Sequence, residues 1–189
     1  LCAVNPDVVF VASALNDHLR AEQNWYASSD LSFVEYGALQ LLDERFGGCR
    51  ELSGFNVALF RALGIPCGID RVVQNPHRIG SHMWTFMVDT DGRKLPYLWN
   101  YYNIDREERM EEKYGKVYRD YFSVQTTNWA VSYPDEDIPG ILKNPFLRDV
   151  SDEYFGRNVA VVPLYDSAGD GRLCYLAVFN NAGWSPVAV

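Results

Sequence analysis

One segment constrains the fold more than any other: ERFGGCRELSGFNVALFRALGIPCGID, residues 44–70, in which a cysteine follows two glycines. Its large apolar residues recur mostly at spacings of three and four, which predicts a helix with one buried face; they are Leu52, Phe55, Leu59, Phe60 and Leu63. Gly64 and Pro66 predict the end of this helix, because glycine suits a helix C-terminus and proline cannot continue the turn. A strand is predicted directly afterwards, at 67–74. Cys49 therefore begins a core helix that leads into a sheet.

The position of Cys49 suits a nucleophile. Unpaired N–H groups and the helix dipole favour an anion at a helix N-terminus, and the thiolate is the reactive form of cysteine. Gly47 and Gly48 leave the backbone bare, so a substrate can approach closely and the N–H groups can hold an oxyanion. An inert buried thiol fits the same position. The residues alone leave both interpretations open.

A nucleophilic cysteine needs a base, and His82 is the best candidate among the three histidines. The segment SHMWTFMVDTDGRKLPYLW, residues 81–99, predicts a hairpin that turns at Asp91-Gly92. His82 opens the first strand of this hairpin, and a rigid strand start is a good place to present an imidazole. A half-buried structural histidine is the alternative.

Helical spacing dominates the N-terminal side of the chain, and β-like runs dominate its end. Apolar residues recur at helical spacing in 7–23, 28–46 and 105–122. Two β-like runs, 158–166 and 172–181, flank a Ser-Ala-Gly-Asp-Gly turn. We expect these two runs to form part of a small separate sheet.

These patterns predict three parts. A core occupies residues 1–130, a proline-containing bridge occupies 131–150, and a partial β-sandwich-like unit occupies 151–189. The sequence starts abruptly and stops within apolar residues. We therefore expect it to be a piece of a longer protein, with the last unit truncated.

Composition excludes several kinds of partner. The net charge of −8 argues against nucleic acid and anionic membrane surfaces, because both select for basic patches. No apolar run approaches the roughly 20 residues that a membrane-spanning helix needs. The four cysteines contain no Cys-x-x-Cys pair and the histidines show no paired metal spacing, so we expect no metal site. We also expect no other cofactor.

Taken as a set, these residues resemble a known family. GGC at a helix start, LFRALGIPCGID at its end and GSHMWTFMVDTDGRKLPY in the strands that follow closely resemble the transglutaminase-like (papain-like cysteine) superfamily. The resemblance implies an α+β fold. N-terminal helices, among them the helix that carries the cysteine, pack on an antiparallel sheet that carries the histidine, and a partial β unit follows. The resemblance further implies Cys49 as the nucleophile and His82 as the base.

The likeness extends beyond the core. GKVYRDYF, FLRDVSDEYF and YLAVFNNAGWSPV are similar to downstream parts of large bacterial transglutaminase-like proteins, which are often exported or surface-located. The resemblance therefore implies an exported, periplasmic or cell-surface protein.

The third residue of the expected site departs from the family pattern. The family usually carries an aspartate two residues after the strand proline, and this chain has Leu98 there. A two-residue hairpin turn would place Tyr101 opposite His82, whereas a three-residue loop would place Asn100 there. An Asn amide can hold an imidazole in one tautomer, so Asn100 is our candidate. Asp105, or no third residue at all, are the alternatives.

These observations predict a cysteine-dependent acyl transfer on an amide, either peptide or amide hydrolysis or transamidation. The substrate is a peptide or protein, and Trp84 and Gly48 are the candidate contacts to it. The alternative is a catalytically degenerate module that binds a peptide or glycan at the cell surface. A third interpretation is a purely structural module in which Cys49 is buried.

Overall fold

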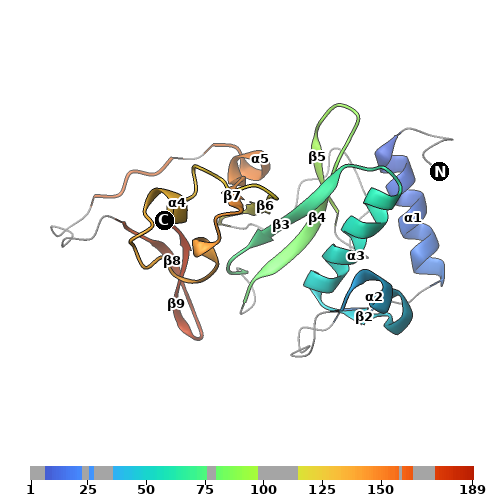
Figure 1. Ribbon diagram of the computed structural model, residues 1–189, viewed down its shortest axis with the longest axis horizontal. Helices are drawn as coiled ribbons and strands as arrows, with labels where there is room; N and C mark the ends of the chain where they lie inside the picture. The colour runs from blue at the N-terminus through green and yellow to red at the C-terminus, as the bar shows by residue number, and fades with distance from the viewer. Residues whose placement is uncertain are drawn as a thin grey trace. The chain divides into compact units, whose positions relative to one another are not determined.

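A computed structural model of the 189-residue chain describes residues 7–22, 26–27, 36–75, 80–97, 115–157, 159–163 and 173–189. It has the α+β composition that the sequence predicts (Figure 1). The helices and strands, in chain order, are α1 Val8–Glu22, β1 Tyr26–Ala27, α2 Ala38–Glu44, β2 Phe46–Gly47, α3 Cys49–Ala62, β3 Cys67–Val72, β4 His82–Val88, β5 Lys94–Tyr97, β6 Tyr118–Asp120, α4 Trp129–Ser132, the 3₁₀ helix η1 Gly140–Lys143, β7 Leu147–Asp149, α5 Ser151–Phe155, β8 Leu176–Asn180 and β9 Gly183–Ala188.

The chain divides into two compact units. The first contains Leu1–Asp70 and His82–Met110, and the second contains Arg71–Ser81 and Glu111–Val189. The domain boundaries at 130 and 150 stay a prediction. None of the helices in the described ranges has the length and apolarity that crossing a membrane requires.

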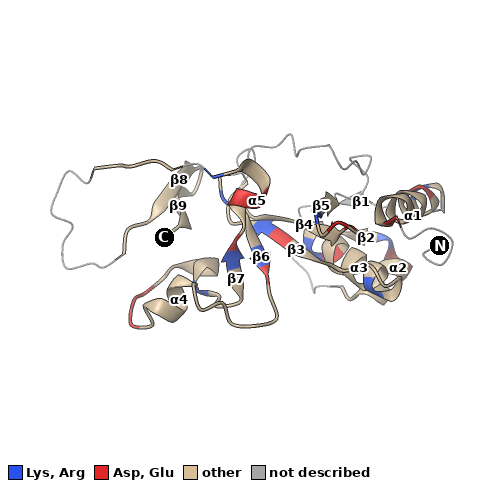
Figure 2. Cartoon of the chain, turned by 90° about the horizontal axis from the view of Figure 1, so that it is seen from above, with Lys and Arg blue, Asp and Glu red and all other residues tan. Residues whose placement is uncertain are grey.

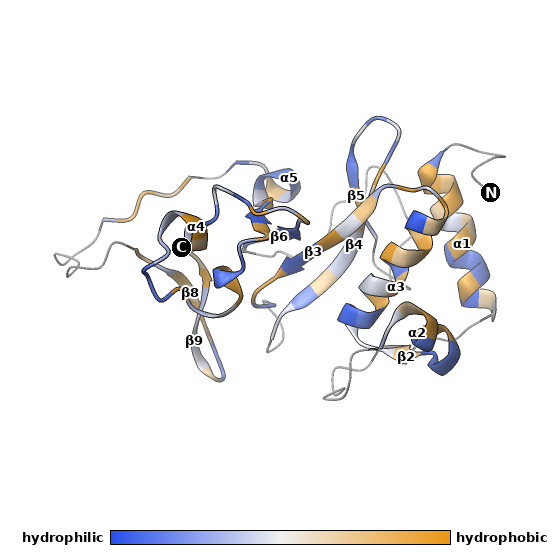
Figure 3. Cartoon of the chain, viewed as in Figure 1, coloured by the Kyte–Doolittle hydropathy of each residue, from blue (hydrophilic) through white to orange (hydrophobic). Residues whose placement is uncertain are grey.

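The helix predicted at 7–23 is confirmed as α1. Asp7 caps it, because its carboxylate accepts a hydrogen bond of 2.9 Å from the Val9 N–H. The predicted apolar face is buried in the core of the first unit, together with the buried residues of α3; its predicted members are Val8, Val11, Leu15 and Leu19, and Ala12 is buried with them. Figure 3 shows hydrophobic and hydrophilic residues alternating along both helices, as burial of one face requires.

The helix predicted at 28–46 is wrong in its extent. Gly37 is extended, with φ −70° and ψ 164°, so α2 begins only at Ala38, and Arg45 ends it in the left-handed conformation at φ 57°. Leu41 is fully buried whereas Leu42 is 39% exposed, because consecutive residues point about 100° apart on a helix. Residues 28–35 lie outside the described ranges.

The helix and strand predicted around Cys49 are confirmed as α3 and β3. Gly64 adopts φ +78°, and the next N–H, from Ile65, donates a 2.9 Å hydrogen bond back to the Phe60 carbonyl. This left-handed glycine ends α3, and Pro66 follows it, as the sequence predicts.

The predicted hairpin is confirmed as β4 and β5. Thr85 pairs with Tyr97 and Val88 with Lys94, and the Asp89 N–H donates to the Arg93 carbonyl at 2.9 Å. Three residues, 90–92, therefore form the loop. In the first unit the strand order is β5-β4-β3. Pro96 is tolerated because β5 is an edge strand in the described part of this sheet.

The helical spacing predicted at 105–122 fails over its described end. Residues 118–120 form strand β6, which pairs antiparallel with β7, so sheet pairing overrides the local helical pattern. Residues 105–114 lie outside the described ranges. In the second unit β6 lies between the end of β3 and β7. Arg71 forms an ion pair with Asp120, and Figure 2 shows charges of both signs on these strands.

The predicted strand at 158–166 is not found in its described part. Residues 159–163 form no strand, and the side chains of Val159 and Val161 are 75% and 91% exposed. The strand predicted within 172–181 is confirmed as β8, but its partner is β9. Asn180 closes the turn between them, because its side-chain oxygen accepts from the Ala182 N–H at 2.8 Å.

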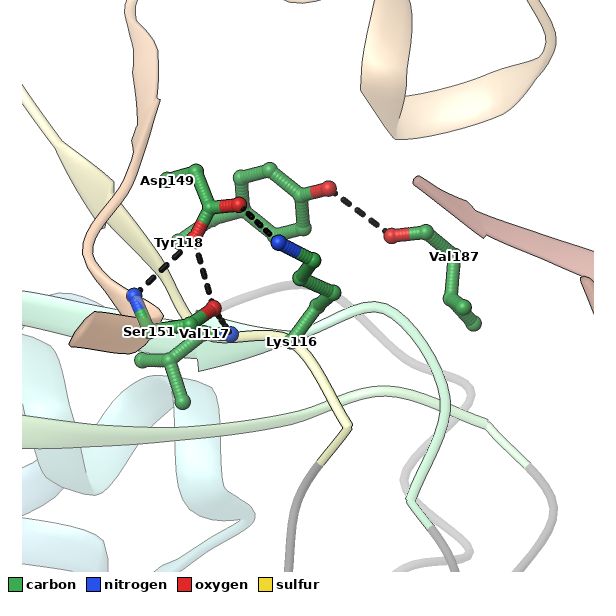
Figure 4. A network of polar contacts seen from close by, with 6 residues as sticks. All are labelled: Lys116, Val117, Tyr118, Asp149, Ser151 and Val187. Carbon is green, nitrogen blue, oxygen red and sulfur yellow. Dashed lines mark hydrogen bonds and ion pairs between the residues drawn. The ribbon is translucent and has the colours of Figure 1, made fainter. Parts of the chain in front are cut away.

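A polar network holds the segment before β6 to the end of β7 (Figure 4). Lys116 Nζ lies 2.5 Å from Asp149 Oδ2. The Ser151 hydroxyl donates to Asp149 Oδ1 at 2.5 Å and accepts from the Val117 N–H at 3.0 Å. Burial alone would raise the pKa of Asp149, but hydrogen bonds from Lys116 and Ser151, with the charge of Lys116, outweigh it and lower that pKa.

The lowered pKa of Asp149 makes the free energy of unfolding depend on pH. A carboxyl with a lower pKa in the folded state stabilises the fold above its unfolded pKa, and this contribution is lost as the pH falls through the folded value. Asp149→Asn should therefore destabilise the protein at pH 7 and have a smaller effect below about pH 4. Urea unfolding of both proteins at several pH values measures this. An equal difference in stability at every pH would contradict it.

Candidate active site

Cys49 is the first residue of α3, and Gly48 is the N-cap at φ −83° and ψ −174°. The Gly48 N–H donates to Glu51 Oε2 at 3.0 Å, and the Leu52 N–H donates to the Gly48 carbonyl at 3.0 Å. In a full capping box the N-cap side chain also accepts from the backbone N–H of the third helical residue, but glycine has no side chain for this. Glu51 therefore makes the one side-chain bond of this cap. Its carboxylate also lies where the helix dipole favours an anion.

The bond to Glu51 matters for the predicted role of Gly48. Its N–H is already used within the helix cap and is not available to an oxyanion in this arrangement. The N–H of Cys49 is the first of α3 and has no acceptor within its own helix. That N–H is therefore the better candidate donor. A substrate contact by Gly48 itself stays a prediction.

Gly47 fixes the path of the chain into Cys49. A Cβ atom at this position would lie 2.7 Å from Leu41 Cδ1 and 2.9 Å from Glu51 Cβ. Both separations are shorter than side chains tolerate, so only glycine allows α2 and the start of α3 to approach this closely. The same residue pairs with Ala27 in the short parallel β1–β2 ladder.

His82 is the first residue of β4 and is half-buried. Its ring centroid lies 5.9 Å from that of Trp84, with the planes tilted by 37°. The Trp84 side chain is only 1% exposed, so it supports the imidazole and presents little surface in this structure. A contact between Trp84 and substrate stays a prediction.

Two hydrogen bonds show how α3 lies along β4. The Thr85 hydroxyl donates to the Ser53 carbonyl at 3.3 Å, and beyond the helix the Val88 N–H donates to the Pro66 carbonyl at 2.8 Å. Helix and strand therefore advance in the same direction, as their positions in Figure 1 also indicate.

This shared direction brings the two predicted residues to the same end of the helix–strand pair. Cys49 precedes Ser53 by one turn, or about 6 Å of helix. His82 precedes Thr85 by three strand residues, or about 10 Å. The helix start and the strand start that the sequence singled out therefore lie at the same end, and the pairing of the two side chains stays a prediction.

Side-chain alternation adds a constraint. Thr85 faces α3, and successive strand residues point to opposite faces. His82 and Trp84 therefore belong to the other face of β4, in agreement with their ring contact. A contact between Cys49 and His82 must accordingly pass around the start of the strand, where His82 is the terminal residue.

The hairpin register bears on the third residue. Thr85 pairs with Tyr97, and continuing that register would bring position 100 opposite position 82. This is the three-residue-loop alternative that favoured Asn100. Asn100, Leu98 and Asp105 all lie outside the described residues, so the orienting role stays a prediction.

The other thiols have different surroundings. Within the described ranges Cys49, Cys67 and Cys174 are free thiols. The Cys67 thiol donates weakly to the Val57 carbonyl at 3.6 Å. Burial raises the pKa of Cys67 and outweighs the lowering effect of nearby Arg61, so this thiol should react slowly. No group of three metal-ligating side chains occurs in the part of the chain that the structure describes.

Comparison with known proteins supports one family. The profile of the transglutaminase-like superfamily matches residues 4–99, about half of the chain, and this range includes Cys49 and His82. No curated protein matches the chain. No solved structure matches it either.

Sequence reasoning missed one residue of this region. Thr85 is fully buried within β4, and its hydroxyl contacts the helix that carries Cys49. The sequence signal was present, because Thr85 is the single hydroxyl residue in the otherwise apolar run MWTFMV.

Replacing Gly47 should disturb the helix start. We expect Gly47→Ala to destabilise the fold by about 1–3 kcal/mol, because the added methyl overpacks against Leu41 and Glu51. Gly115→Ala is the matched control, since this exposed residue lies outside the helices and strands and its added Cβ meets nothing within 4 Å. Urea unfolding compares the two variants. Equal stability of both would show that the close approach at Gly47 is not required.

Proposed function

Because this chain belongs to the transglutaminase-like superfamily, we propose that it is a cysteine-dependent acyl-transfer enzyme that acts on amides. The Cys49 sulfur attacks the amide carbonyl while His82 takes the thiol proton. His82 then protonates the departing amine, which leaves a thioester on Cys49. Water or a second amine releases the acyl group, giving hydrolysis or transamidation.

One observation carries this proposal. Parallel packing of α3 on β4 puts the start of the cysteine helix and the start of the histidine strand at the same end. Both residues are on regular elements, which hold reactive groups more precisely than loops do. The N–H of Cys49 is the candidate donor to the oxyanion that forms on the substrate carbonyl.

Orientation of His82 belongs to the same proposal. An imidazole that acts as a base needs an acceptor for its second nitrogen, which fixes the tautomer. The family's usual aspartate is replaced by Leu98, which cannot accept a hydrogen bond. We assign this role to Asn100, because the hairpin loop has the length that favours that position.

A binding-only module is the second candidate. Three observations favour it: Leu98 at the usual aspartate position, the Gly48 N–H already bonded to Glu51, and the placement of His82 on the face of β4 away from α3. Such a module would hold a peptide or glycan without cleaving it. An exported or cell-surface location would suit either function and is itself a proposal.

The paired site predicts unequal thiol reactivity. Under brief iodoacetamide treatment at about pH 6, we expect Cys49 to be alkylated at least tenfold faster than Cys67, because the proposed base His82 takes the Cys49 thiol proton whereas burial raises the pKa of Cys67. His82→Ala should remove most of this advantage. Mass mapping of peptides gives each rate in one sample. Equal rates for the two thiols in the folded protein would favour the binding-only module.

The orienting residue has its own test. Asn100→Ala should lower the turnover of an amide substrate by up to about 10⁴-fold, the loss that follows when a catalytic histidine takes the wrong tautomer. Leu98→Asp should retain or raise turnover if its carboxylate reaches the ring. Asn181→Ala is the control, because this residue is exposed in the turn between β8 and β9. Release of a fluorescent amine from a peptide amide measures turnover, and unchanged turnover in Asn100→Ala would exclude Asn100 from this role.

A further inference from the structure

We propose that Thr85 is a positioning residue that fixes how far along β4 the helix α3 lies, and thereby where Cys49 stands relative to His82. This inference rests on the proposed function, since it deepens the account of the same site. The observation is a hydrogen bond between two buried groups, from the Thr85 hydroxyl to the Ser53 carbonyl at 3.3 Å.

The position of α3 along β4 is not set by apolar packing alone. The helix buries Leu52, Phe55 and Phe60 in a core that also contains Met87 and Leu95. Such contacts are non-directional and depend mainly on area. They resist a large slide of the helix because the core is close-packed, but they define its position less narrowly than a directional bond does. Even a small slide changes the separation of the two residues at the end. Misplacement of reacting groups by 1 Å can cost about 10²-fold in rate.

The hydrogen bond from Thr85 to Ser53 is directional, unlike the apolar contacts. Its acceptor, Ser53, lies one helical turn after Cys49, on the same side of α3. Its donor lies three residues after His82 on β4. The bond thus joins helix and strand close to the proposed reacting pair, one helical turn after Cys49 and three strand residues after His82. A hydrogen bond requires a narrow range of distance and angle, so it permits less sliding than the core does.

The choice of threonine is itself informative. Thr85 is 0% exposed and Ser53 is 3% exposed, and a buried hydroxyl costs stability unless it is hydrogen-bonded. Valine has nearly the same shape and suits a strand equally well. The Ser53 carbonyl also has the ordinary helical acceptor role toward the amide four residues ahead. Thr85→Val therefore leaves no backbone group unpaired, and the melting temperature should change by no more than about 3 °C.

A second buried polar group lies near Ser53 on α3. Asn56 is 2% exposed, and its Oδ1 atom has no hydrogen-bond partner among the described residues. Asn56 follows Ser53 by three residues, so the two lie on the same side of the helix. The Thr85–Ser53 bond is therefore the polar contact in this region that carries the inference.

The experiment measures the rate of Cys49 alkylation by iodoacetamide between about pH 5 and 9 in the full chain. The wild type is compared with His82→Ala, Thr85→Val, Thr85→Ser and the control Thr90→Val, whose residue is exposed in the hairpin loop. Peptide mass mapping separates Cys49 from the other thiols. We expect the part of the Cys49 alkylation rate that depends on His82 to be at least threefold lower in Thr85→Val than in the wild type at acidic pH. Thr85→Ser and Thr90→Val should behave like the wild type.

The outcomes separate this inference from the proposed function. If the wild type and His82→Ala react alike at every pH, the proposed function and the positioning role both fail. If His82 matters but Thr85→Val matches the wild type, the positioning role alone is overturned. Thr85→Ala serves as a second variant, since it cannot overpack the core. If both Thr85→Val and Thr85→Ala unfold while Thr85→Ser does not, the hydroxyl serves stability and the positioning role is likewise overturned.

Discussion

The packing of α3 along β4 is the constraint on which the rest of the first unit depends. Helix and strand run in the same direction, tied by the Thr85–Ser53 bond and by the Val88–Pro66 bond beyond the helix. The left-handed Gly64 makes the return from helix to β3 short. Because these elements follow one another closely in the chain, the helix start and the strand start must lie at one end. Any chemistry of this unit is therefore expected there.

The close approach of α2 at Gly47 and the cap formed by Glu51 fix the backbone at the start of α3. Gly47 allows α2 to come within contact distance of the start of α3, and Glu51 satisfies the Gly48 N–H. Both features fix the backbone around Cys49, and both lower its freedom to rearrange around a substrate. α1 supports the far side of the core, where the Tyr97 hydroxyl donates to Asn16 Oδ1 at 3.1 Å.

Local patterns predicted most of the first unit, apart from the extent of α2, because the elements around Cys49 and His82 are close in sequence. The helix at Cys49, the glycine and proline at its end and the β4–β5 hairpin all carry their signals within a few residues. Part of the second unit depends on contacts between distant residues, because β6 forms by pairing with residues 147–149. β8 and β9 form a local hairpin, but its turn was not predicted. Side-chain patterns alone do not show which distant strand will pair.

The elements that carry the candidate site were predictable, but its geometry was not. Sequence patterns predicted that Cys49 begins a helix and His82 a strand, and both elements are found, while the catalytic roles stay a proposal. The placement of His82 on the face of β4 away from α3 emerges only from the contact of Thr85. The most direct test is therefore a crystal structure of the protein. The account predicts that the Cys49 sulfur lies about 3–4.5 Å from a ring nitrogen of His82, as in a loosely paired free enzyme. Ordered side chains separated by more than about 6 Å, with Trp84 between them, would contradict it.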